Sequence, residues 1–283
     1  MRFKLYREHG ALNSPNIFNA FEIGLKTLGH ESVQADEDVA VIWSVLWNGR
    51  MAPNKAIYDQ CRIKNKPIII IEVGNLLRNQ TWRICLNHIN GLGEFGNDLE
   101  LDFDRPKKLG VELKPIKTER NSSILIATQH HKSLQWENMP SMTQWTLETI
   151  EKIRKYTDRR IIIRPHPRSP MPGIEIEFKN VDRQDPVKIN GSYDDFDIQY
   201  NHHCVVNHNS GPPILAAIEG IPVITGSSSL AFPVSSKIED IENIQLPDRE
   251  EWFTKITHCE WTVDEIAKGI PLKRLENKIL SQL

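Results

Sequence analysis

Apolar and polar residues in the first third of the chain follow the periods of alternating strands and helices. The continuously apolar stretch Val39–Val45 and the run Pro67–Glu72 each have the length of a buried strand. After Ser14, a candidate N-cap, apolar residues recur every three or four positions until Gly29, which predicts an amphipathic helix. A more polar helix is expected over Pro53–Lys64. Buried strands that alternate with helices indicate a parallel sheet covered on both faces.

The pattern breaks between Asp102 and Asn121, where prolines and charges occur with little periodicity, as in a linker. It then restarts, and the expected strands and helices are Ser123–Ala127, Thr143–Tyr156, Arg160–Arg164, Cys204–Val206, Pro212–Glu219 and Pro222–Thr225. We predict an α/β fold of two Rossmann-like domains facing a central cleft (GT-B type), with a C-terminal helical tail. The expected domains are residues 1–118 and 119–266, followed by a helix at 267–283 that packs back on the first domain.

The composition is that of an ordinary globular chain. The 283 residues are 39% hydrophobic and carry a net charge of −2, so a strongly basic nucleic-acid-binding surface is not expected. The four cysteines form no C-x-x-C pair, which argues against a zinc ribbon or a disulfide framework. No apolar run approaches the roughly 18 residues of a membrane span, and charged residues follow Met1 directly. We expect a cytoplasmic protein, or one of the host cytoplasm if a phage encodes it.

The most informative segment is a strand–turn–helix sequence, Asn207-His-Asn209-Ser210-Gly211-Pro-Pro. Asn209 or Ser210 can cap the helix that follows, and Gly211 lets a ligand approach the backbone. Unpaired amides at a helix N-terminus, together with the helix dipole, favour an anion such as a phosphate. The alternative is a strand–helix crossover with ordinary capping.

A second polar cluster, Arg164-Pro-His166-Pro-Arg168, ends another buried strand. Guanidinium groups suit phosphate oxygens, and a donating His can neutralise a leaving pyrophosphate. Such clusters otherwise stabilise loops, but two of them after strands of one domain favour a ligand site. Ser227 and Ser228, after the strand at 222–225, either contact the same donor or belong to a plain linker.

Together the two clusters resemble the donor half of GT-B glycosyltransferases. The sequence Arg164–Arg168, followed by Asn209-Ser-Gly and then Glu-Gly-Ile-Pro-Val-Ile, is similar to the His-Pro and Ser motifs of the capsule-polysaccharide, polysialyl- and glycerophosphate-transferase group. In that group both motifs contact the phosphates of a nucleotide donor. The resemblance implies this role for His166 and for Ser210, with Gly211 beside it.

The resemblance covers residues 160–226 and departs from the pattern at one position. Many GT-B enzymes place a Glu inside the helix to bind ribose, but here Leu215 and Ala216 stand there and Glu219 comes late. The resemblance implies a nucleotide diphosphate sugar as donor, in our interpretation a UDP-sugar, and no required cofactor. A phage DNA-modifying glycosyltransferase is included among the candidates.

No acidic or histidine pattern predicts a metal site. Asp102-Phe-Asp104 lies in the linker, and Asp195-Phe-Asp197 lies far from a clear strand end. In the pairs His130-His131 and His202-His203, adjacent side chains diverge and lack a carboxylate partner at helical spacing. Basic side chains and a helix dipole can stabilise a leaving diphosphate in GT-B enzymes, so we expect no metal.

Sugar transfer with inversion needs a base for the acceptor hydroxyl, expected in the first domain. Glu8 and His9 lie in the loop after the predicted strand Arg2–Tyr6. Glu72 ends a buried strand, where it either acts on a substrate or caps a turn. We rank Glu8 and His9 slightly ahead of Glu72.

The acceptor contacts are expected in loops of the same domain. Trp47 and Arg50 follow the second strand, Trp82 lies farther along, and Asn13 lies in the first loop. Indole faces stack on sugars or bases, and an Arg can reach a phosphate or a ring edge. Trp43, within an apolar strand, is expected in the core.

These observations predict a metal-independent, inverting GT-B glycosyltransferase that moves a sugar from a nucleotide diphosphate sugar to an acceptor hydroxyl. The acceptor is a hydroxymethylated pyrimidine in double-stranded phage DNA, reached by base flipping, or a polysaccharide or lipid-linked glycan. Small size and the lack of a membrane anchor favour DNA. A nucleotide-sugar epimerase and a non-catalytic nucleotide- or glycan-binding module are the alternatives, and the oligomeric state is open.

Overall fold

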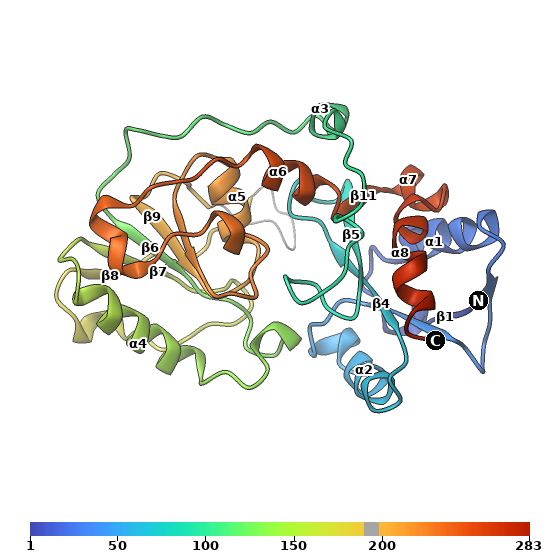
Figure 1. The fold of residues 1–283 in the computed structure, drawn as a ribbon. Helices are drawn as coiled ribbons and strands as arrows, with labels where there is room; N and C mark the ends of the chain where they lie inside the picture. Colours follow the sequence, from blue (N-terminus) through green and yellow to red (C-terminus); the bar gives the residue numbers. More distant parts are fainter. Residues whose placement is uncertain (190–197) are drawn as a thin grey trace. The chain divides into compact units, whose positions relative to one another are not determined.

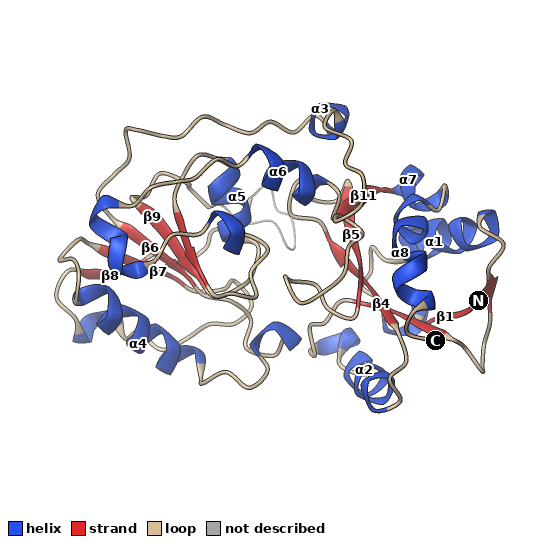
Figure 2. Cartoon of the chain, in the orientation of Figure 1, coloured by secondary structure: helices blue, strands red, loops and turns tan. Residues whose placement is uncertain are grey.

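The computed structural model describes residues 1–189 and 198–283, which form two compact units (Figure 1). Unit 1 comprises residues 1–111, 132–135 and 253–283, and unit 2 comprises residues 112–131 and 136–252. Both units combine strands and helices (Figure 2). The acidic pair Asp195 and Asp197 lies outside the described residues.

Unit 1 is built on a six-stranded sheet of order β11-β5-β4-β3-β1-β2. The strands are β1 (Arg2–Leu5), β2 (Glu31–Ser32), β3 (Val39–Trp43), β4 (Ile68–Val73), β5 (Thr81–Leu86) and β11 (Glu260–Thr262). The buried strands predicted from the apolar runs are confirmed as β3 and β4. Strands β2, β1, β3 and β4 run parallel, whereas β5 is antiparallel to both β4 and β11.

The helices of unit 1 cover both faces of this sheet (Figure 1). They are α1 (Pro15–Thr27), α2 (Asn54–Ile63), α3 (Arg105–Leu109), α7 (Val263–Ala267) and α8 (Ile270–Leu280), while α6 (Glu250–Thr257) begins in unit 2. Apolar side chains of α1, α7 and α8 share one core with Trp43 and Trp261, and α2 packs on the opposite face. None of the described helices is long and apolar enough to cross a membrane.

Unit 2 is built on a wholly parallel sheet of order β10-β9-β6-β7-β8. Its strands and longer helices are β6 (Ile124–Ala127), β7 (Ile161–Arg164), β8 (Val181–Arg183), β9 (Cys204–Asn207), β10 (Val223–Thr225), α4 (Met142–Arg154) and α5 (Pro212–Ile218). Helix α4 covers one face of the sheet and α5 the other (Figure 1). Because all five strands are parallel, the loops after them emerge at one edge.

Two features of unit 1 differ from the sequence-based expectation. The sheet is mixed because Thr81–Leu86, with Arg83 at its centre, is a buried antiparallel strand. Arg83 is accommodated there because it donates to the carbonyls of Val73 and Ile89. In addition, the chain returns to unit 1 at Phe253 rather than after residue 266, because β11 pairs with β5 and α7 packs on α1.

A half-buried histidine, His88, makes the stability of unit 1 dependent on pH. Burial lowers the pKa of His88 to about 4. Between about pH 4 and 6.5, the His88 side chain is therefore neutral in the folded chain but protonated in the unfolded chain. Its contribution to stability is complete above about pH 6.5 and is lost as the pH falls towards about 4.

Unfolding in this pH range is accompanied by the binding of protons, and we expect His88→Gln to bind up to one proton fewer than the wild type. Between pH 4.5 and 6, the slope of the unfolding free energy should fall by up to about 1.4 kcal/mol per pH unit. Urea denaturation at a series of pH values measures this slope. Equal slopes for the variant and the wild type would show that His88 is not protonated on unfolding.

Candidate functional site

Four loops meet at the carboxyl edge of the unit 2 sheet. They follow the neighbouring strands β10, β9, β6 and β7, and hydrogen bonds link them into one layer. Asn207 donates to the carbonyl of Ala127 (2.7 Å), joining the ends of β9 and β6. The amide of His166 donates to the Thr128 hydroxyl (2.9 Å), joining the loops after β7 and β6. Residues from distant parts of the sequence are thereby held on one edge.

The loop after β7 presents the predicted Arg/His cluster. Arg164 is buried, His166 is half-buried and Arg168 is exposed. The turn is closed by a hydrogen bond from the Ser169 amide to the His166 carbonyl (3.0 Å). Nδ1 of His166 accepts the amide of Arg168 (3.1 Å), so a neutral His166 ring carries its proton on Nε2. The cluster therefore offers a guanidinium group and an imidazole donor side by side.

The loop after β6 adds two histidines, His130 and His131, which we had considered only as metal ligands and had not expected to bind a metal. The His130 ring stacks on that of His131, with centroids 5.4 Å apart, and meets the His166 ring edge-on at 5.3 Å. His131 Nδ1 lies 2.6 Å from the Ser169 hydroxyl. Three imidazoles thus line the edge beside Arg168. Their joint placement could not be read from the sequence, because it depends on β6 and β7 being neighbours.

Two residues expected to contact the donor instead build the loop after β9. The Asn207 side chain is buried, donates to the Ser210 hydroxyl (2.9 Å) and accepts the Ser210 amide (2.8 Å). The buried Asn209 side chain accepts from Gln129 (2.9 Å) and donates to Ser228 (2.9 Å). We correct the prediction for both: they shape the loop, and Ser210 and Gly211 remain the half-buried candidates.

The backbone at the start of α5 offers fewer amides to an anion than expected. The Ser210 amide already donates to Asn207, and the Ile214 amide donates to the Gly211 carbonyl (3.0 Å). Pro212 and Pro213 have no amide hydrogen. An anion at this edge would therefore be held chiefly by side chains, in particular the Arg/His cluster of the loop after β7.

The loop after β10 places Ser227 in solvent and Ser228 against Asn209. A side chain at Gly226 would come within 2.7 Å of His208 Nδ1, so glycine is needed where the loops after β9 and β10 cross. Burial lowers the pKa of His208, which favours a neutral ring at pH 7. Ser228 is thus the better placed of the two predicted serines.

In unit 1, the predicted base residues lie at the carboxyl ends of two strands, β1 and β4, which have β3 between them. Glu8 and His9 occupy a 3₁₀ turn after β1, and the Glu8 side chain is 62% exposed, 3.7 Å from His9 Nε2. Asn54, at the start of α2, donates to the carbonyls of His9 (3.3 Å) and Trp43 (2.6 Å) and ties this loop to β3.

Glu72 is held more firmly than Glu8. Its Oε2 accepts the Ser44 hydroxyl at 2.6 Å, and its Oε1 accepts the Val73 amide at 2.9 Å. The residue is half-buried, so Glu72 combines fixed donors with partial access to solvent. A fixed carboxylate at a strand end is better suited to accept a proton from a bound substrate than a mobile one.

The predicted acceptor residues of unit 1 have different environments. Trp47 is half-buried, with its ring 5.7 Å from that of Tyr58, and Arg50 and Asn13 are exposed. Trp82 is only 6% exposed and packs in the core of unit 1. We therefore correct its assignment: a ring in the core offers no face to an acceptor.

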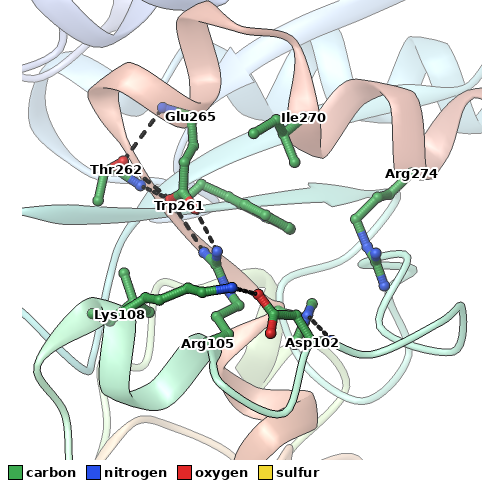
Figure 3. A pocket seen from close by; sticks show the side chains of 10 residues that line it. Asp102, Arg105, Lys108, Trp261, Thr262, Glu265, Ile270 and Arg274 are labelled. Atoms are coloured by element: carbon green, nitrogen blue, oxygen red, sulfur yellow. Dashed lines mark hydrogen bonds and ion pairs between the residues drawn. The ribbon is translucent and has the colours of Figure 1, made fainter.

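A hollow of about 410 Å³ lies elsewhere in unit 1, between α3, β11 and the start of α8 (Figure 3). Arg105 lies at its side, forms an ion pair with Glu265 and covers the Trp261 ring at 4.1 Å. Lys108 pairs with Asp102 (2.5 Å). Because these charges are paired with one another, we interpret the side chains around the hollow as a structural ion-pair network rather than as a binding site.

Among the described residues that were considered as metal ligands, Asp102 and the pair His202 and His203 have other partners in the folded chain. Asp102 pairs with Lys108, while His202 contacts the Ser123 hydroxyl and His203 a backbone carbonyl. Within residues 1–189 and 198–283, no three His, Cys, Asp or Glu side chains are grouped so as to hold a metal ion.

No protein-family model and no curated protein matches the sequence. Solved structures resemble the chain. The β-Kdo 2,7 transferase of Thermosulfurimonas dismutans KpsC has a TM-score of 0.50 and 12% identity, over 96% of this chain and 99% of that one. The β-Kdo 2,4 transferase of the same protein has a TM-score of 0.49 and 10% identity, over 90% of this chain and 89% of that one. A UDP-GlcNAc 2-epimerase from Methanocaldococcus jannaschii has a TM-score of 0.34 and 12% identity, over 99% of each chain. The chain has the GT-B fold, with two Rossmann-like units.

Proposed function

We propose that this GT-B chain is a glycosyltransferase in which unit 2 binds a nucleotide-activated sugar and unit 1 activates the acceptor hydroxyl. The observation that carries the proposal is the Arg/His layer at the carboxyl edge of the unit 2 sheet. There, His130, His131, His166 and Arg168 come from two loops that hydrogen bonds and ring contacts hold together. Such a layer suits the negative charge of a phosphate or diphosphate.

The assignment of roles follows from exposure and hydrogen bonding. Arg168 is exposed and pairs with a phosphate oxygen, while His166 donates from Nε2 to the oxygen that gains charge as the bond to the sugar breaks. Ser210 and Ser228 add hydroxyl donors from the adjoining loops. The donor is a nucleotide diphosphate sugar, and a UDP-sugar is the first candidate.

For the base in unit 1 we now place Glu72 ahead of Glu8 and His9. An inverting transfer needs a group that removes the proton from the acceptor hydroxyl as the new bond to the sugar forms. Glu72 has one donor on each carboxylate oxygen, whereas Glu8 extends into solvent. The hydroxyl proton passes to Glu72, and the nucleotide leaves with the bonding electrons.

A glycan hydroxyl is the acceptor that the described residues favour. Reading a flipped DNA base would call on aromatic side chains that stack on it, and one of the two expected tryptophans, Trp82, lies in the core. The net charge of −2 also gives little general attraction to DNA. Retention of hydroxymethylated duplex DNA at low salt, abolished by Arg50→Ala, would reverse this preference.

The donor assignment is tested by nucleotide-induced shifts of the melting temperature. UDP, CDP, GDP and CMP are each added to the wild type and to the variants His166→Ala and Arg168→Ala. We expect at least one nucleotide to stabilise the wild type, and each variant to bind it about tenfold to a hundredfold more weakly, since hydrogen bonds to charged groups contribute about 1.5–3 kcal/mol.

Arg160→Ala is the matched control for this experiment. Arg160 lies directly before β7, at the end of the strand opposite to the Arg/His cluster. It forms an ion pair with Asp182 at 2.6 Å. It should leave nucleotide binding unchanged. If His166→Ala and Arg168→Ala bind the nucleotide as well as Arg160→Ala does, the phosphate site is not at this edge.

A further inference from the structure

Ser44, directly after β3, has a backbone conformation that serine rarely adopts. Its φ is +63°, in the left-handed region, and the residue is only 4% exposed. Every other described non-glycine residue with positive φ is an Asn or Asp, the types that tolerate this region best. These residues are Asp36, Asn65, Asn79, Asn87, Asn138 and Asn180. A strained conformation at a buried serine is the kind of feature that clusters at functional sites.

The contacts of Ser44 show what this conformation accomplishes. The Ser44 amide donates to the carbonyl of Ile71 (2.8 Å), which fixes the turn against β4. The hydroxyl oxygen accepts the amide of Leu46 (3.2 Å) and donates its own hydrogen to Glu72 Oε2 (2.6 Å). Because the oxygen already accepts an amide, its hydrogen is directed at the carboxylate.

We propose that Ser44 is a positioning residue for Glu72. Its left-handed turn brings the hydroxyl to one carboxylate oxygen while the Val73 amide binds the other, so that Glu72 keeps one orientation at the carboxyl edge of unit 1. The inference rests on the proposed function insofar as Glu72 accepts a proton there. A side chain held by two donors loses little entropy when it meets the acceptor hydroxyl.

Two substitutions separate the hydroxyl from the backbone strain. Ser44→Ala removes the hydroxyl and keeps a side chain in the left-handed region, whereas Ser44→Gly removes the hydroxyl and relieves the strain. We expect the Gly variant to be more stable than the Ala variant. Both should lose about tenfold to a hundredfold in kcat, with the Kd for the nucleotide unchanged, because only the position of the carboxylate is disturbed.

The first measurement is independent of turnover. Crystal structures of the full-length wild type and of Ser44→Gly should show the Glu72 carboxylate in one orientation in the wild type and displaced or in several orientations in the variant. An unchanged, single orientation of Glu72 in Ser44→Gly would overturn the inference, whatever the protein catalyses.

The second measurement is the hydrolysis of UDP-glucose, in which water takes the place of the acceptor hydroxyl and UDP is released, in the Glu72 wild-type and Glu72→Gln backgrounds. Ser44→Gly should slow release in the first background and add nothing in the second, because the two residues act as a unit. A wild-type rate for Ser44→Gly, or the same loss in both backgrounds, contradicts positioning. A different pair of results would contradict the proposed function and leave the positioning role of Ser44 intact. In that case Glu72→Gln releases UDP at the wild-type rate, and the structure of Ser44→Gly shows the Glu72 carboxylate displaced.

Asn65→Gly provides the control for substitution at a left-handed position. Asn65 also has a positive φ (+50°), follows α2 in the same unit and is exposed. The change to Gly should leave both the UDP-release rate and the orientation of Glu72 as in the wild type.

Discussion

Glu72→Gln is expected to lower kcat for sugar transfer by about 10²- to 10⁴-fold, the contribution typical of a general base. Gln is nearly the same size and can still accept the Ser44 hydrogen bond, so the fold should be retained, but the amide cannot take a proton. Nucleotide binding should be unaffected, because the Arg/His layer belongs to unit 2. The measurement is kcat with saturating donor, beside the melting-temperature shift with nucleotide.

The variants Glu8→Gln and His9→Gln decide between the two candidate base sites. If Glu72 is the base, these changes should reduce kcat by less than about tenfold, because the Glu8 side chain is largely in solvent. Full activity of Glu72→Gln with a large loss in Glu8→Gln or His9→Gln would restore the ranking that the sequence suggested. Full activity in all three would place the base elsewhere.

Glu260→Ala is expected to reduce the free energy of unfolding by about 3–5 kcal/mol, because three buried or partly buried donors lose their acceptor and each unsatisfied buried donor costs about 1–3 kcal/mol. Glu260 is only 1% exposed and accepts the amides of Asn75 (2.6 Å) and Leu76 (3.0 Å) and the hydroxyl of Thr81 (2.8 Å). The substitution leaves these three donors without their acceptor in a buried setting. Denaturant unfolding measures the loss.

Glu31→Ala is the matched control for this prediction. Glu31 is exposed in the edge strand β2 of the same unit, and its removal should change the free energy of unfolding by no more than about 0.5 kcal/mol. Equal effects of the two substitutions would show that the Glu260 network does not hold unit 1 together. Gly74→Ala should destabilise the same loop, because a Cβ there would overlap the Glu260 carboxylate.

The sequence predicted best those strands in which consecutive residues are all apolar and buried. In β3 and β4, runs of Val and Ile leave no polar face, so length and composition suffice to identify a buried strand. Strand β5 was missed because Arg83 interrupts its apolar pattern, and that arginine is tolerated only through carbonyl partners brought by the fold. Strand β11 was missed because its three residues carry no periodicity.

In the candidate site, the sequence identified the loops better than the orientation of their side chains. A His between two arginines after a strand indicates an anion site, and His166 and Arg168 do lie at the expected edge. Asn207 and Asn209 had the same polar character, yet they face inward and bind the loop together. A local pattern specifies polarity, but the direction of a loop side chain depends on partners in other loops.

By itself, the sequence determined the α/β class, the continuously apolar strands of both units, and the two polar clusters that end β7 and β9. These follow from the period and continuity of apolar residues and from local turn chemistry, which neighbouring residues encode. Only the tertiary structure decided that β6 brings His130 beside His166, that Ser44 holds Glu72, and that Glu260 binds the loop after β4. Those contacts join residues up to 185 positions apart, so they depend on strand order and pairing, which local periodicity does not specify.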